Sequence, residues 1–326
     1  MARDNSIDSL KGFLIILVIV GHVITSLDNV NVINHAVMGL IYIFHMPLFI
    51  LISGYVTKRP DQQSASAMWK GILNILIPLL IFQVLTALRL YLYHNEDFIS
   101  SLVTFPYGIL WYLMCLIYWR IALYYTPKAI LDRPIVHLSL ALALSLTVGL
   151  TGIGSSWAIH RALNFYFFFL LGFYYRQGAL DGQWWNCNIL HLAVAVIILP
   201  LLLWLYPRCG RMMNGAENYA LADLPQKALI LSCSIAMSLL VFNLRRDIGC
   251  LRHIGKESLF YYLYHIHIIT LLIVPLVNRL DLMLTFPFIV VYSAVVLGIV
   301  LLMNKISFFK WLIRPTFNFS RKQQQQ

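Results

Sequence analysis

Two residues of the first apolar segment have side chains suited to acid-base chemistry, Lys11 near its beginning and His22 near its end. In a helix, eleven residues place the two within about 20° of one another around the axis and about 16 Å apart along it. Asp8 falls on the same face, about 40° from His22. An ionisable residue deep in an apolar segment costs free energy to place there, so His22 is a candidate for function. The alternative is an anchoring lysine at the membrane interface and a structural histidine.

Histidines are the ionisable side chains that recur deep in the apolar segments, because His45, His265 and His267 lie there as well. His265 and His267 are about 200° apart on a helix, so one of them at most faces the centre of a bundle. All 13 acidic residues lie outside the apolar segments or at their edges. Ion-coupled transporters generally need buried carboxylates, so this pattern counts against transport. The five cysteines are scattered without Cys-x-x-Cys spacing, and we expect neither a disulfide framework nor a metal site.

The composition predicts the element that must position these residues, the transmembrane helix. The 326 residues are 60% hydrophobic and 11% charged, with a mean hydropathy of +0.77, which excludes an ordinary soluble enzyme, a disordered chain and a nucleic-acid-binding module. Runs of about 20 apolar residues, the length that crosses a bilayer, occur near 13–27, 37–56, 71–90, 106–125, 135–151, 157–175, 188–206, 225–243, 258–278 and 285–304. We therefore predict an all-α, polytopic helical bundle of about ten transmembrane helices.

The basic residues predict the orientation of this bundle. With ten spans, the side that holds both termini carries 18 Lys and Arg residues and the other side carries six, so both termini are predicted to be cytoplasmic. The net charge of +11 then needs no nucleic acid as a partner. Residues 1–314 are predicted to form a single transmembrane domain, and 315–326 a short cytoplasmic tail without order. The first apolar segment lacks a cleavage site and is expected to be a retained span. The longest outer connection, 207–225, is either a lid or a plain loop.

Lys11 and His22 form a pattern of a cation, ten residues and then His in the first span. Further motifs follow it in the chain: Phe44–Phe49 with Ile52–Tyr55, Leu110–Leu113, Arg161 with Phe167–Tyr174, and Ile254–Leu259 with Tyr262–His265. In type and order these segments resemble the membrane-bound acyltransferase 3 family, which contains bacterial sugar O-acetyltransferases, and they are most similar to its fucose 4-O-acetylase-like members. Lys11 stands where many members have Arg, which keeps the charge but loses the bidentate geometry.

The resemblance implies a chemistry centred on His22, with acetyl-CoA as the acyl donor and no metal. The acceptor is a sugar hydroxyl of a surface polysaccharide, a lipopolysaccharide or a lipid-linked glycan precursor. A neutral imidazole can take the proton from this hydroxyl as it attacks the thioester, and a covalent acetyl-imidazole is the alternative. His45 lies within about 5 Å of the same depth and is a candidate partner of His22, along with Ser53, a tyrosine or a backbone carbonyl.

The remaining candidate residues divide between donor and acceptor. We assign Lys11, Lys58 and Arg59 to the phosphates of acetyl-CoA and count Asp8, the acid beside Lys11, in the same donor-binding site. The orientation signal alone is the alternative for the cations. Further helpers would be Arg245, Arg246, Arg252 or Lys256. Acceptor binding is assigned to Arg161, Trp111, Tyr112, Ser53 and His265; an interfacial aromatic belt is the alternative for the tryptophan and tyrosine, and a structural hydrogen-bonding role is the alternative for His265.

The resulting hypothesis is a multi-pass O-acetyltransferase of the bacterial inner membrane whose partners are a glycan acceptor and the membrane lipids. A polytopic glycan transporter or flippase is the competing class. A succinyl or longer-acyl transferase of the same family differs from the leading hypothesis only in the volume of its acyl pocket.

Overall fold

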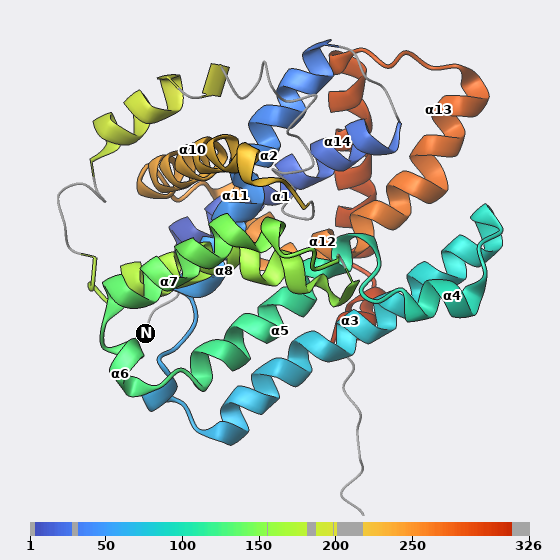
Figure 1. Ribbon diagram of the computed structural model, residues 1–326. Coiled ribbons are helices and arrows are strands. Elements are labelled where there is room, and N and C mark those ends of the chain that lie inside the picture. The colour runs from blue at the N-terminus through green and yellow to red at the C-terminus, as the bar shows by residue number, and fades with distance from the viewer. Residues whose placement is uncertain are drawn as a thin grey trace, which may run out of the picture.

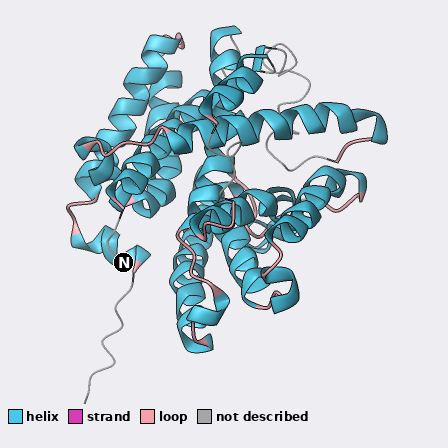
Figure 2. Ribbon diagram, turned by 90° about the vertical axis from the view of Figure 1, so that its left-hand side faces the viewer, coloured by secondary structure: helices cyan, strands magenta, loops and turns pink. Residues whose placement is uncertain are grey.

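The computed structural model describes residues 4–27, 32–154, 156–180, 187–197, 199–200 and 218–314. The predicted tail 315–326 and, within the outer connection, residues 207–217 lie outside these ranges. All the regular elements of the described residues are helices (Figure 2). The helices, in chain order, are α1 Asn5–Ser26, α2 Val32–Tyr55, α3 Ala65–His94, α4 Phe98–Val103, α5 Trp111–Tyr124, α6 Lys128–Leu131, α7 Pro134–Thr147, α8 Ile159–Arg176, α10 Leu224–Asn243, α11 Gly249–Lys256, α12 Ser258–Ile268, α13 Val274–Leu280, α14 Phe286–Met303 and α15 Ser307–Ile313.

Seven helical stretches in the described residues are long and apolar enough to cross a membrane, which confirms the all-α polytopic fold. They are Asn5–Ser26, Ile33–Tyr55, Ala65–Tyr93, Phe98–Tyr124, Leu221–Asn243, Ser258–Leu280 and Phe286–Met303. The other three predicted spans also coincide with helices. The span predicted at 135–151 is the shorter α7, and the one at 188–206 contains the apolar helix Asn188–Ile197. The span at 157–175 is α8, whose first turns carry polar residues.

Helix α1 holds both Lys11 and His22 and is packed closely against α11. The side chain of Asp4 caps α1 by accepting a hydrogen bond of 2.9 Å from the backbone N–H of Ser6. Where α1 and α11 cross, a Cβ atom on Gly12 would collide with the carbonyl oxygen of Leu251, and one on Gly255 with that of Asp8. Glycine therefore permits an approach of the two backbones that any larger residue would prevent.

Helices α2 and α8 approach one another in the same way. A Cβ atom on Gly54 would collide with the carbonyl oxygen of Phe169, and one on Gly172 with that of Leu51. Near the same crossing, Arg176 donates a hydrogen bond of 3.0 Å to the carbonyl oxygen of Tyr55. This crossing fixes the helix of His45 against the helix of Arg161.

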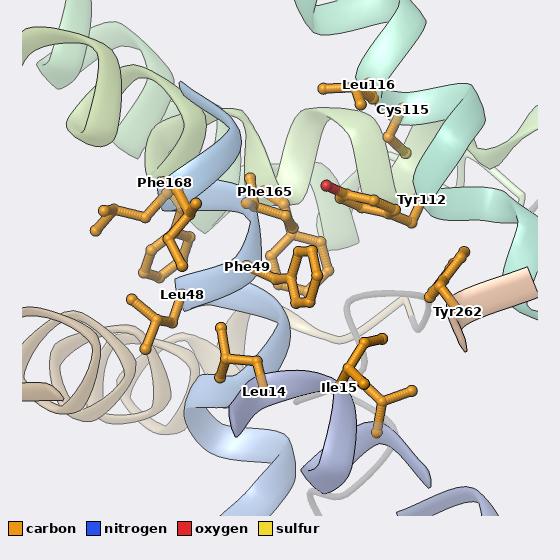
Figure 3. Packing of buried hydrophobic residues seen from close by; sticks show 14 of the residues in the cluster. Leu14, Ile15, Leu48, Phe49, Tyr112, Cys115, Leu116, Phe165, Phe168 and Tyr262 are labelled. Carbon is orange, nitrogen blue, oxygen red and sulfur yellow. The ribbon is translucent and has the colours of Figure 1, made fainter. Parts of the chain in front are cut away.

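The hydrophobic core lies where α1, α2, α5 and α8 meet. Figure 3 shows Leu14 and Ile15 of α1 below Leu48 of α2 and Phe168 of α8, and all four are fully buried. Figure 1 places these helices in the interior of the bundle, with α3 beside α5 along one edge. The part of α1 between Lys11 and His22 therefore crosses the hydrophobic core, and the two polar residues lie on either side of it.

Candidate active site

A cavity of about 910 Å³ opens at the end of the bundle where α1 ends and α8 begins, which is the outer side in the predicted orientation. We call it the outer cavity. Its lining combines residues from seven α-helices, from the connections before α5 and α8, and from the helical turn that follows α12. The polar and aromatic lining side chains are His22, Thr25, Tyr42, His45, Thr86, Arg89, Thr104, Phe105, Tyr107, Trp111, Ser156, Trp157, Arg161, Phe165, Tyr262 and Thr270. It therefore unites His22, His45, Trp111 and Arg161, which the sequence places in four separate segments.

His22 borders the outer cavity with its ring available for chemistry. Within the described residues, neither of its ring nitrogens makes a hydrogen bond, whereas its backbone carbonyl accepts a bond of 3.2 Å from the hydroxyl of Thr25. The ring of His265 lies behind it, with the two ring centroids 5.2 Å apart. His265 is fully buried and does not line the cavity, so it contacts His22 from the protein side.

The two neighbouring histidines are held in defined tautomers. Nδ1 of His265 lies 3.0 Å from the carbonyl oxygen of Tyr261, and Nδ1 of His45 lies 2.8 Å from that of Ile41. A carbonyl oxygen can only accept, so each Nδ1 carries the proton and each Nε2 is left as an acceptor. Nε2 of His265 is buried without a hydrogen-bond partner in the described part of the chain. That nitrogen can accept an N–H from a protonated neighbour.

The residues predicted to bind the acceptor fall into two groups. Arg161 and Trp111 line the outer cavity, and the guanidinium of Arg161 lies over the indole at 4.8 Å from the ring centroid. Ser53 and Tyr112 instead share a buried hydrogen bond of 2.6 Å that joins α2 to α5. Neither of them borders the cavity. Because Trp111 directly precedes Tyr112 in the chain, the hydrogen bond between Ser53 and Tyr112 helps to hold Trp111 in place.

A second cavity, of about 710 Å³, lies at the opposite end of α1 and contains Lys11. We call it the cytoplasmic cavity, after the predicted orientation. Its charged lining residues are Lys11, Lys256, Glu257, Lys310 and Arg314, so cations outnumber acids by four to one. The ammonium of Lys11 also forms an ion pair of 2.8 Å with the buried Asp8, which holds Lys11 at the end of α1.

Lys58 and Arg59, which the sequence grouped with Lys11, lie elsewhere. Neither borders the cytoplasmic cavity. Arg59 forms ion pairs with Asp61 at 3.2 Å and with Asp132 at 3.0 Å. The structure therefore brings Asp8 and Lys256 to Lys11 but does not bring these two cations there.

Sequence reasoning missed several residues that border the two cavities. Arg89 and Tyr262 line the outer cavity, and Lys310 and Arg314 line the cytoplasmic one. Arg89 had a usable signal, because it lies inside the predicted span 71–90 and a cation at that position is a functional candidate. Lys310 and Arg314 are nearly 300 residues from Lys11 in the chain, and only tertiary packing reveals their proximity.

Comparisons with known proteins agree with the motifs. A family model described as an acyltransferase domain matches residues 4–305. Nodulation protein NolL of Sinorhizobium fredii is 33% identical over 121 residues, which make up 34% of this chain and 33% of NolL, so the match spans about a third of either protein. No solved structure matches the chain. Because the family model covers α1 to α14 and every residue that lines the outer cavity, the chain belongs to the acyltransferase 3 family.

Proposed function

We propose that this acyltransferase transfers an acetyl group from acetyl-CoA to a sugar hydroxyl of a surface polysaccharide, a lipopolysaccharide or a lipid-linked glycan precursor, in the bacterial inner membrane. The supporting observation is that Lys11 and His22, on one helix, border two different cavities. The donor and the acceptor enter from opposite sides and react at His22.

The cytoplasmic cavity suits the phosphates of CoA, which is made in the cytoplasm. Lys11, Lys256, Lys310 and Arg314 supply the cations, and phosphates bind such groups through charge-assisted hydrogen bonds. The pantetheine arm then follows α1 for about 16 Å to reach His22. The two cavities share no lining residue, so the side chains between them have to move apart when the donor binds.

The transfer step places the imidazole of His22 between the two substrates. A ring nitrogen takes the proton of the acceptor hydroxyl while its oxygen attacks the thioester carbonyl carbon, and the C–S bond breaks. The proton on His22 then passes to the departing CoA sulfur. During the step the imidazolium donates its second N–H toward Nε2 of His265, which occupies the place that a carboxylate holds in a catalytic triad. An acetyl-imidazole on His22 is the alternative route.

The acceptor sugar is proposed to bind between Arg161 and the aromatic side chains of the outer cavity. Trp111 and Phe165 both line the cavity and stack on one another with their ring centroids 5.7 Å apart. Aromatic faces bury the apolar side of a sugar ring, while the guanidinium of Arg161 binds its oxygen atoms. The volume of about 910 Å³ lies in the range of small-molecule pockets.

The test is mass spectrometry of the surface glycans from cells with and without the chain, alongside transfer of labelled acetyl from acetyl-CoA by the purified protein. Loss of one acetyl mass per sugar supports the proposal. Loss of a succinyl or longer acyl mass instead would identify a different donor. Unmodified glycan that accumulates on the cytoplasmic face would indicate a transporter and contradict the proposal.

A further inference from the structure

The outer cavity carries two arginines and no carboxylate. Arg89, near the end of α3, and Arg161, in the first turn of α8, both line it, and none of its lining residues in the described part of the chain is Asp or Glu. The two arginines come from helices that are distant in the sequence, and both line this one cavity. This gives the cavity a net positive character at the place where the acceptor must bind.

Within the described residues, neither guanidinium forms an ion pair with a carboxylate. Arg89 is only 9% exposed, and the Nε atoms of Arg89 and Arg161 are buried without a hydrogen-bond partner. Glu96 is the carboxylate whose charge acts on Arg89, but it accepts a hydrogen bond of 3.2 Å from the Ser101 hydroxyl and does not line the cavity. Leaving a buried charge unpaired is costly, and a ligand that carries the opposite charge would remove this cost.

Membrane topology does not account for these two arginines. The orientation rule concentrates Lys and Arg on the cytoplasmic side, and this chain has 18 there against six on the outer side. Arg89 and Arg161 belong to the minority that the rule disfavours. The indole of Trp111 stabilises Arg161 through a cation–π contact. This contact uses the face of the guanidinium, so the N–H donors in the plane of the group can still bind an anion.

We propose that the acceptor is an anionic glycan whose phosphate or carboxylate binds between Arg89 and Arg161. This rests on the proposed function and deepens it by naming the charge of the acceptor. A guanidinium matches either anion through two parallel N–H···O hydrogen bonds. The anion would anchor the glycan beside Trp111, so that one of its hydroxyl groups reaches His22 on the same cavity wall.

The experiment measures binding, so that it does not depend on turnover. The purified full-length protein in detergent is titrated by calorimetry with methyl glucuronide, glucose 1-phosphate and the neutral methyl glucoside. We expect both anions to bind at least about tenfold more tightly than the neutral sugar, and this preference to weaken at high salt. Comparison of the two anions identifies whether the carboxylate or the phosphate is the better ligand. Equal affinity for the charged and neutral sugars, or no detectable binding of either anion, overturns the proposal.

Variants then locate the binding. Arg89→Gln and Arg161→Gln should each weaken anion binding about 10- to 100-fold, the usual effect of losing a hydrogen bond to a charged group, and Arg→Lys should recover part of it. Arg279→Gln removes an exposed outer-side arginine that does not line the cavity and should change nothing. Anion binding that weakens in Lys11→Gln but persists in Arg89→Gln and Arg161→Gln would place the anion in the cytoplasmic cavity and refute the assignment. Anion binding that persists in the Arg89 and Arg161 variants refutes the assignment.

The outcome is separable from that of the proposed function. If the protein transfers acetyl groups but binds charged and neutral sugars equally, only the anionic acceptor is wrong. If it binds anions in the outer cavity but never consumes acetyl-CoA, the proposed donor is wrong and the anion site stands.

Discussion

Replacing His22 with Ala is the most direct test of the assigned chemistry. A positioned general base contributes about 10² to 10⁴ to the rate, which corresponds to about 2.7–5.4 kcal/mol of transition-state stabilisation. We expect His22→Ala to slow acetyl transfer by this factor. The ring makes no hydrogen bond with the described residues and borders the outer cavity, so its removal breaks no buried network and the variant should fold.

The geometry also predicts what His22→Ala leaves unchanged. The cytoplasmic cavity, where the donor phosphates are proposed to bind, begins at Lys11, about 16 Å away along α1. Acetyl-CoA should therefore bind the variant within a few fold of the parent. His253→Ala serves as the matched control, because His253 is an exposed histidine that lines neither cavity.

The assay is transfer of labelled acetyl from acetyl-CoA to the extracted glycan by purified protein, with donor affinity measured by calorimetry on the same samples. A His22→Ala protein that still transfers acetyl at a near-parental rate would refute the catalytic role of His22, and His45 would be tested next. Loss of transfer together with loss of donor binding would instead show that His22 supports the donor site and not the chemical step.

Three further outcomes follow from the same geometry. Lys11→Gln should weaken acetyl-CoA binding, as measured by calorimetry, whereas Lys11→Arg should keep most of it; equal affinity for Lys11→Gln and the parent would leave Lys11 as a topological anchor. His265→Ala should lower kcat more than it changes KM for acetyl-CoA, since the ring contacts His22 and lines neither cavity; an unchanged kcat would exclude a positioning role. Gly172→Ala should lower the thermal midpoint by several degrees because the new methyl group meets the backbone of α2, whereas Gly298→Ala, which has open space around it, should not; similar midpoints for both would show that the crossing tolerates a larger residue.

The fold was largely predictable because the bilayer imposes a length and a polarity on each helix. Each predicted apolar run coincides with a helix or part of one, although α3 extends from Ala65 to His94 where the sequence predicted 71–90. Hydropathy detects the apolar middle of a helix and not its ends. The ends depend on caps such as Ser64, whose side chain accepts a hydrogen bond from the N–H of Ala67.

The candidate site was predictable only in part, because the sequence reveals a residue's type and its helical face but not the element opposite it. His22 and Lys11 were found from their spacing on one helix. The roles of Ser53 and Tyr112 were not separable from that of Trp111, since a residue that lines a cavity and one that supports it can be neighbours in the same motif. Arg89 was counted only as an outer charge, because the sequence does not show that α3 and α8 contribute to the same cavity.

The glycine positions explain why the motifs mix packing with chemistry. Gly54 and Gly172 lie within segments that resemble family motifs, and both serve the close crossing of α2 with α8. They border neither cavity. The same two helices also carry residues that line the outer cavity, such as Met46 of α2 and Phe165 of α8. By fixing how α2 crosses α8, the two glycines therefore also fix the position of the cavity wall.

One stretch of chain, from α11 to α12, supports both functional ends of α1. Gly255 lies against the backbone of α1 at Asp8, beside Lys11, and ten residues later His265 lies against His22. Glu257 stands between the two helices with non-helical backbone angles, so the chain turns there and then runs along α1 toward its outer end. The same stretch therefore holds α1 both beside Lys11 and beside His22, so the relative positions of these two residues depend on α11 and α12 as well as on α1 itself.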